Sequence, residues 1–172
     1  MNGKWILRFA LILLTAGWMV FIFCMSSEGG EQSAYLSGGV TKALQETFFG
    51  DWETLPAKEY DTQMAGLHFF VRKFAHFAEF FVLGMLFFGM FLSFGIKPWT
   101  AALVSFGAGA LYAVFDELHQ SFVSGRSMAV FDMMVDAAGV FFGISLISAA
   151  LFFAGLRRRH NKDQSGIKPL ES

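Results

Sequence analysis

Four apolar runs, each close to the length of a membrane-spanning helix, divide the sequence. They cover about residues 5–25, 74–96, 99–118 and 131–156. A helix needs about 20 consecutive apolar residues to cross the hydrocarbon core of a bilayer. We therefore predict an all-α polytopic membrane protein with four transmembrane helices.

Composition agrees with this fold class. The chain has 172 residues, of which 55% are hydrophobic and 16% charged, whereas soluble domains average about 45–50% apolar and about 25% charged residues. We predict one membrane domain over residues 1–160 and a disordered polar tail over 161–172. The single cysteine, Cys24, excludes an internal disulfide and a cysteine-rich zinc site. No basic patch with interleaved aromatics occurs, so we expect no nucleic-acid partner.

The first apolar run and the connection after it have distinct patterns. A cleaved signal peptide is the alternative to a first span, but the run is long for one and no small-x-small cleavage motif follows, so we interpret it as a retained anchor. The connection over 26–66 is acidic, and apolar residues recur every fourth position in it, at Leu36, Val40, Leu44 and Phe48. This spacing predicts an amphipathic helix lying on the membrane surface. Asp61 is a plausible N-cap for the next helix.

Basic residues predict the orientation of the chain. In a four-span arrangement the following residues fall on one side of the membrane: Lys4, Arg8, Lys97, Arg157, Arg158 and Arg159. The acidic 26–66 connection and the 120–130 loop fall on the other. Because Lys and Arg are enriched in cytoplasmic loops, we predict a multi-pass protein of the cell membrane with both termini cytoplasmic.

Polar residues, nearly all of them ionisable, gather beside three of the apolar runs. They are Arg72, Lys73, His76 and Glu79 in one cluster, and Asp116, Glu117, His119, Gln120, Arg126, Asp132 and Asp136 in another. Such groups at the edge of a bilayer are costly and by default indicate a functional site. At about 1.5 Å of rise per residue, Glu79, Asp116 and Asp136 each lie about 26–32 Å from the far end of their span, near the outer boundary of a hydrocarbon core about 30 Å thick.

Helical spacing indicates that these clusters face one another. Arg72, His76 and Glu79 share one helix face, and so do Asp132 and Asp136. Asp136 is followed on its face by Gly139 and Gly143, small residues that let helices approach closely. Ser105, Gly109, Tyr112 and Asp116 form a comparable stripe on the third span. We predict that three spans converge on one outward-facing polar pocket.

Several motifs in these regions resemble a known family. They are Ser26-Ser27, Arg72-Lys73-x-x-His76-x-x-Glu79, Asp116-Glu117-x-His119-Gln120, Gly125-Arg126, Asp132-x-x-x-Asp136 and Gly139-x-x-x-Gly143. Together they resemble the VanZ-like family of small bacterial membrane proteins, which is named for a member linked to resistance to the glycopeptide teicoplanin. Glu28 and Ser124 depart from the pattern, where Gln and Pro are expected. The resemblance implies a bacterial cell-membrane protein with a role in the cell envelope.

The polar residues suggest three main kinds of function, and transport by a proton relay through the same carboxylates is a fourth alternative. An enzyme acting on a phosphate-bearing lipid would hold phosphate with Arg and transfer protons through His. A buried ion-pair network would instead balance Arg72 and Arg126 against Glu79, Asp116 and Asp132. A metal site is suggested by the pairs His76-x-x-Glu79 and Asp116-x-x-His119.

We predict an outward-facing pocket that binds, and in the enzyme interpretation processes, an anionic phosphate-bearing envelope lipid or cell-wall precursor. The alternative is a non-catalytic protein whose pocket is a buried ion-pair network. The candidate catalytic residues are His76, Glu79, Asp116, His119, Asp132 and Asp136. The candidate substrate-binding residues are Arg72, Lys73, Glu117, Gln120 and Arg126. Because cations stand next to the His and Asp pairs, we assign no metal ligand and no cofactor from the sequence.

Overall fold

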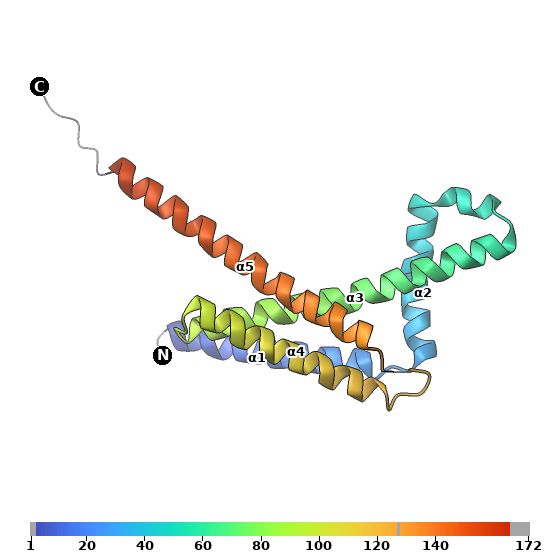
Figure 1. Cartoon of the computed structure of the whole chain (residues 1–172), viewed down its shortest axis with the longest axis horizontal. Helices are drawn as coiled ribbons and strands as arrows, with labels where there is room; N and C mark the ends of the chain where they lie inside the picture. The colour runs from blue at the N-terminus through green and yellow to red at the C-terminus, as the bar shows by residue number, and fades with distance from the viewer. Residues whose placement is uncertain (1–2, 127, 166–172) are drawn as a thin grey trace, which may run out of the picture.

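The computed structural model describes residues 3–126 and 128–165, and this part of the chain is helical throughout apart from turns (Figure 1). Its elements are α1 (Gly3–Ser26), α2 (Gly30–Phe48), the 3-10 helix η1 (Gly50–Thr54), α3 (Ala57–Ser93), α4 (Pro98–Gln120) and α5 (Val130–Ser165). Within the described residues, α1, α3, α4 and α5 are long and apolar enough to cross a membrane. The predicted all-α, four-span fold class is confirmed.

Two helix boundaries differ from the prediction. α3 begins at Ala57, because Pro56 occupies its N-cap position and the Pro56 carbonyl accepts the backbone N–H groups of Glu59 and Tyr60. Asp61 therefore lies inside the helix and does not cap it. At the other end of the chain, α5 continues through Ser165, beyond the predicted end of the last span at about residue 156. No glycine or proline interrupts the sequence between Leu156 and Gly166, and residues 166–172 lie outside the described part.

α1, α3 and α4 run alongside one another, and α2 crosses their direction (Figure 1). α3 and α4 form a helical hairpin whose short turn depends on Gly95, with φ +81°, a conformation that glycine adopts without steric cost. At the same end of the bundle, Arg8 Nε donates to the carbonyl of Ser93 over 3.0 Å. The end of α3 is thereby attached to α1.

Glycines create the contact between α3 and α5. A Cβ atom at Gly84 would lie 2.5 Å from the carbonyl oxygen of Val140, and Cβ atoms at Gly139 and Gly143 would overlap the carbonyl oxygens of Phe77 and Phe81. The two backbones therefore touch, as the Gly139-x-x-x-Gly143 motif predicts. Beyond this contact the C-terminal half of α5 diverges from the other helices (Figure 1).

α2 lies against α3 through a polar face. Thr41 and Gln45 are buried, and Thr41 Oγ1 lies 3.3 Å from His68 Nδ1 of α3. The apolar residues Val40 and Phe48 remain 53% and 70% exposed. The predicted helix is therefore present, and Phe48 of its apolar stripe is turned away from the protein.

Candidate functional site

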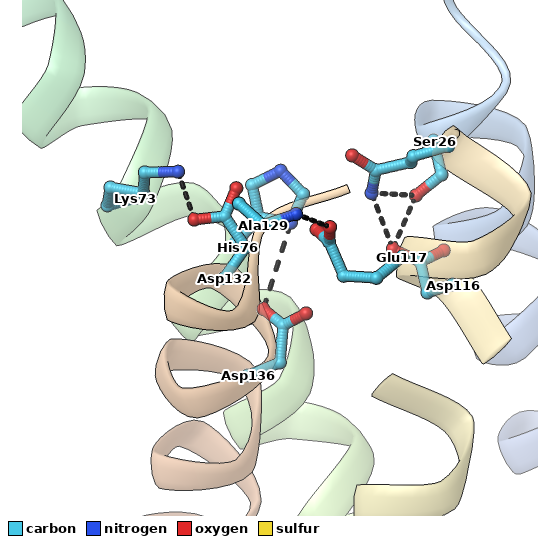
Figure 2. A network of polar contacts seen from close by, with 9 residues as sticks. Ser26, Lys73, His76, Asp116, Glu117, Ala129, Asp132 and Asp136 are labelled. Atoms are coloured by element: carbon cyan, nitrogen blue, oxygen red, sulfur yellow. Dashed lines mark hydrogen bonds and ion pairs between the residues drawn. The ribbon is translucent and has the colours of Figure 1, made fainter. Parts of the chain in front are cut away.

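Polar side chains from α1, α3, α4 and α5 meet at the end of the bundle where α4 ends and α5 begins (Figure 2). Helix rise and shared helix faces predicted that these side chains would lie together. Most of the predicted site residues lie in this region, but they divide into groups with different contacts.

The tightest group is His76 of α3, Asp116 of α4 and Asp136 of α5, which we call the triad. Each residue offers one potential ligand atom, and these three atoms all lie within 4.8 Å of one another. His76 Nδ1 is 3.8 Å from Asp136 Oδ1. The exposed fractions are 9% for His76, 2% for Asp116 and 0% for Asp136. Within residues 3–126 and 128–165, neither oxygen of Asp136 has a hydrogen-bond partner.

Asp116 is held by two donors. Ser26 Oγ and Gln120 Nε2 donate to Asp116 Oδ2 over 2.9 and 2.7 Å (Figure 2), whereas no described residue donates to Oδ1. Gln120, predicted to bind substrate, thus orients a carboxylate in the structure. Ser26 was not among the predicted site residues. A polar residue at the end of an otherwise apolar span was the available signal for this contact.

Two other predicted residues connect helices at the site. Glu117 is fully buried, and its Oε2 accepts the backbone N–H of Ala129, immediately before α5, over 2.9 Å. Lys73 of α3 forms an ion pair with Asp132 of α5 (Figure 2). Both contacts determine where α5 begins relative to α3 and α4.

His119 does not belong to the triad. Its ring stacks on Phe23 of α1, with ring centroids 4.2 Å apart and an interplanar angle of 27°. Its Nδ1 atom is buried and has no hydrogen-bond partner in the described part of the chain. Although His119 lies close in sequence to Asp116, the structure does not bring it to the same point.

A cavity of about 310 Å³ lies beside the triad, among α1, α2, α3 and the loop before α5. Arg72, His76, Glu79 and Arg126 contribute to its walls, together with Glu28. Among the residues that the structure describes, neither Arg72 nor Arg126 has a carboxylate partner within 4.0 Å. Asp132, one of the carboxylates expected to balance them, pairs with Lys73 instead.

The charge of Arg126 is unfavourably placed. Burial lowers the pKa of its guanidinium, and the positive charge of Arg72 lowers it further, while Asp116, Glu117 and Glu28 oppose these effects. Arg126 lies between α4 and α5, outside the spanning segments. The cavity thus presents two mutually repelling cations, and within the described residues no ion pair neutralises either of them.

The sequence matches a known protein family over most of the chain. The model of the VanZ/LLP1 family matches residues 11–153, a range that includes every predicted site residue. No curated protein and no solved structure matches the sequence. Since the family match extends over most of the chain, this four-span membrane protein belongs to the VanZ/LLP1 family.

Proposed function

We propose that the cavity binds the phosphate-bearing headgroup of an anionic membrane lipid or lipid-linked envelope precursor. The observation that carries this proposal is that Arg72 and Arg126 line one cavity without a carboxylate partner among the described residues. A guanidinium binds two phosphate oxygens through parallel N–H donors. A phosphate between the two side chains also offsets their mutual repulsion.

The surroundings of the cavity favour a lipid over a soluble anion. Its walls include the apolar residues Met25, Val40, Val71 and Phe74, which suit the first carbons of an acyl or isoprenoid chain. Its volume of about 310 Å³ is near the lower limit for small-molecule sites, about 300 Å³. This volume fits a headgroup whose hydrocarbon tail remains in the bilayer.

Proton-transferring groups beside the cavity extend the proposal from binding to a reaction at the phosphate. His76 and Glu79 are nearly one helical turn apart on α3, and both line the cavity. Histidine and carboxylate side chains are the commonest general acids and bases. We infer that they exchange a proton with the bound headgroup, whereas the ion-pair alternative gives them no such role.

Orientation and the cell envelope complete the proposal. The basic residues predict cytoplasmic termini, so the cavity would face the outer leaflet of a bacterial cell membrane. Lipids of that leaflet and lipid-linked cell-wall precursors are then the accessible ligands. A link to teicoplanin-type resistance is a further expectation, drawn from the family resemblance alone.

Lipid binding can be tested by native mass spectrometry of the full chain in detergent. We expect phosphatidic acid to bind at least about tenfold more tightly than phosphatidylcholine, and Arg72→Gln or Arg126→Gln to remove most of this preference, since a charged hydrogen-bonded contact contributes about 1.5–3 kcal/mol. Arg158→Gln is the matched control, because Arg158 is exposed near the far end of α5. Folded Arg72→Gln and Arg126→Gln variants with wild-type lipid binding would reject the proposal and favour the structural alternative.

A further inference from the structure

We propose that the triad of His76, Asp116 and Asp136 binds one divalent transition-metal ion. This site goes beyond the lipid-phosphate proposal and does not depend on it. It also differs from the sequence-based assignment, in which no metal ligand was chosen, because the triad unites residues from α3, α4 and α5 that no sequence spacing connects (Figure 2).

The geometry of the triad is close to that of a metal site. The three potential ligand atoms lie within 4.8 Å of one another. Around an ion with bonds of about 2.1 Å, two ligand atoms are at most about 4.2 Å apart. Side-chain movements below about 1 Å therefore complete the coordination.

The triad also has polar atoms that need a partner. Asp136 is 0% exposed, and both of its oxygens lack a hydrogen-bond donor in the described part of the chain, as do Asp116 Oδ1 and His76 Nδ1. A buried carboxylate without a hydrogen bond is strongly unfavourable, and His76 Nδ1, at 3.8 Å, is too distant to donate one. Lys73, which also belongs to this region, pairs with Asp132 instead. A divalent ion would neutralise the two carboxylates and serve as a partner for those atoms of the triad that lack a hydrogen bond.

Hydrogen bonds already orient one of the proposed ligands. Ser26 Oγ and Gln120 Nε2 both donate to Asp116 Oδ2, which fixes the carboxylate plane and leaves Oδ1 available. Outer partners of this kind are typical of metal-binding carboxylates. An imidazole and two carboxylates suit Mn²⁺, Fe²⁺ or Zn²⁺ better than Ca²⁺, which prefers oxygen ligands alone.

The position of the ion suggests its use. His76 belongs to both the triad and the cavity wall, and three protein ligands leave coordination positions open, as in catalytic metal sites. With His76 bound to an ion, Glu79 would be the group left to exchange a proton with the headgroup. The ion would polarise a phosphate oxygen of a ligand held by Arg72 and Arg126. This last step, unlike the site itself, rests on the proposed lipid-phosphate function.

The site can be tested with Mn²⁺ on the full chain in detergent, after removal of metals with EDTA. Calorimetry should find one high-affinity ion per chain, and pulsed electron paramagnetic resonance should detect a coupled imidazole nitrogen. Asp136→Asn preserves the side-chain shape and should weaken Mn²⁺ binding by more than the roughly 10–100-fold that loss of an outer partner costs a metal site. Asp51→Asn, a change at an exposed aspartate of η1, should leave the affinity unchanged.

A second variant and a second ligand make the outcome decisive. His76→Gln should eliminate the nitrogen coupling, whether or not Asp136→Asn folds. The metal site is refuted if Mn²⁺ bound to the wild-type protein shows no nitrogen coupling. It is also refuted if the wild-type protein binds Mn²⁺ no more tightly than Asp136→Asn does. Phosphatidic acid binding is measured in parallel in EDTA. Lipid binding without Mn²⁺ binding rejects only the metal site. Mn²⁺ binding without lipid binding rejects only the lipid proposal.

Discussion

Asp116 and Glu117 are adjacent carboxylates that make different contacts. Successive residues of a helix point about 100° apart, so Asp116 reaches Ser26 of α1 and the triad, while Glu117 reaches the backbone of Ala129 before α5. Both are buried. Asp116 is thereby available to bind a ligand, and Glu117 holds the residue before α5 in position.

Ser26 supports Asp116 directly, so Ser26→Ala should destabilise the protein. It removes a buried donor to a carboxylate, and hydrogen bonds to charged groups contribute about 1.5–3 kcal/mol. The free energy of unfolding can be measured by equilibrium unfolding in mixed micelles. Ser27→Ala is the matched control, because the Ser27 hydroxyl is exposed and donates only to the carbonyl of Phe23 in its own helix. Equal effects of the two substitutions would show that the Ser26–Asp116 contact contributes nothing.

Glu117 can be tested for a structural role against the predicted role in substrate binding. Glu117→Gln keeps an oxygen that can accept the Ala129 N–H, so we expect near-normal stability and unchanged phosphatidic acid binding. Glu117→Ala leaves that N–H without its acceptor and should lower the free energy of unfolding by about 1–3 kcal/mol. Loss of lipid binding in a stable Glu117→Gln protein would instead assign Glu117 to the ligand.

At the scale of helices, α3 and α5 pack closely because glycines, which have no side chain, lie at their contact. Gly143→Ala would place a methyl group against the carbonyl of Phe81, and overpacking of this kind costs about 1–3 kcal/mol. Gly155 lies on the same helix, and a Cβ atom there would have no atom within 4 Å apart from its chain neighbours and the adjacent backbone of its own helix. Gly155→Ala should therefore leave stability unchanged or raise it by up to about 1 kcal/mol. The melting temperatures of Gly143→Ala and Gly155→Ala can be compared by thermal unfolding in one detergent. Equal melting temperatures of the two variants would contradict the backbone contact at Gly143.

Helix faces and depths were predictable from the sequence because they follow from a regular rise and rotation per residue. The packing of Gly139 and Gly143 and the burial of Ser105 and Asp116 are examples. Contacts that depend on how helices turn against one another were not predictable. Sequence spacing placed His119 with Asp116, but it could not show that the ring lies on Phe23.

Irregular segments account for the other differences. The bond from Ala129 to Glu117 depends on the path of the loop between α4 and α5, which has no periodicity to read. The pairing of Lys73 with Asp132, instead of an arginine with Asp132, depends on side-chain reach and on where α5 begins. Such details require the assembled bundle.

At the scale of the whole molecule, the two ends of the bundle differ in charge. Lys4, Arg8 and Lys97 lie at the end where α3 joins α4, and Arg8 is bonded to Ser93 there. The two other connections meet at the opposite end, since a Cβ atom at Gly29 would lie 3.7 Å from the carbonyl oxygen of Ser124. The cavity and the triad belong to this second end.

This asymmetry predicts that the cavity end faces outward, because segments rich in Lys and Arg remain on the cytoplasmic side. In a Cys24→Ala background, a membrane-impermeant thiol reagent applied to intact cells should label Ser124→Cys and Glu53→Cys. It should reach Gln164→Cys only after the cells are opened, which also shows that this site is reactive. Labelling of residue 164 in intact cells, with protection of residues 53 and 124, would invert the orientation. The Arg72 and Arg126 cavity would then face cytoplasmic lipids, and the proposed outer-leaflet ligand would have to be abandoned.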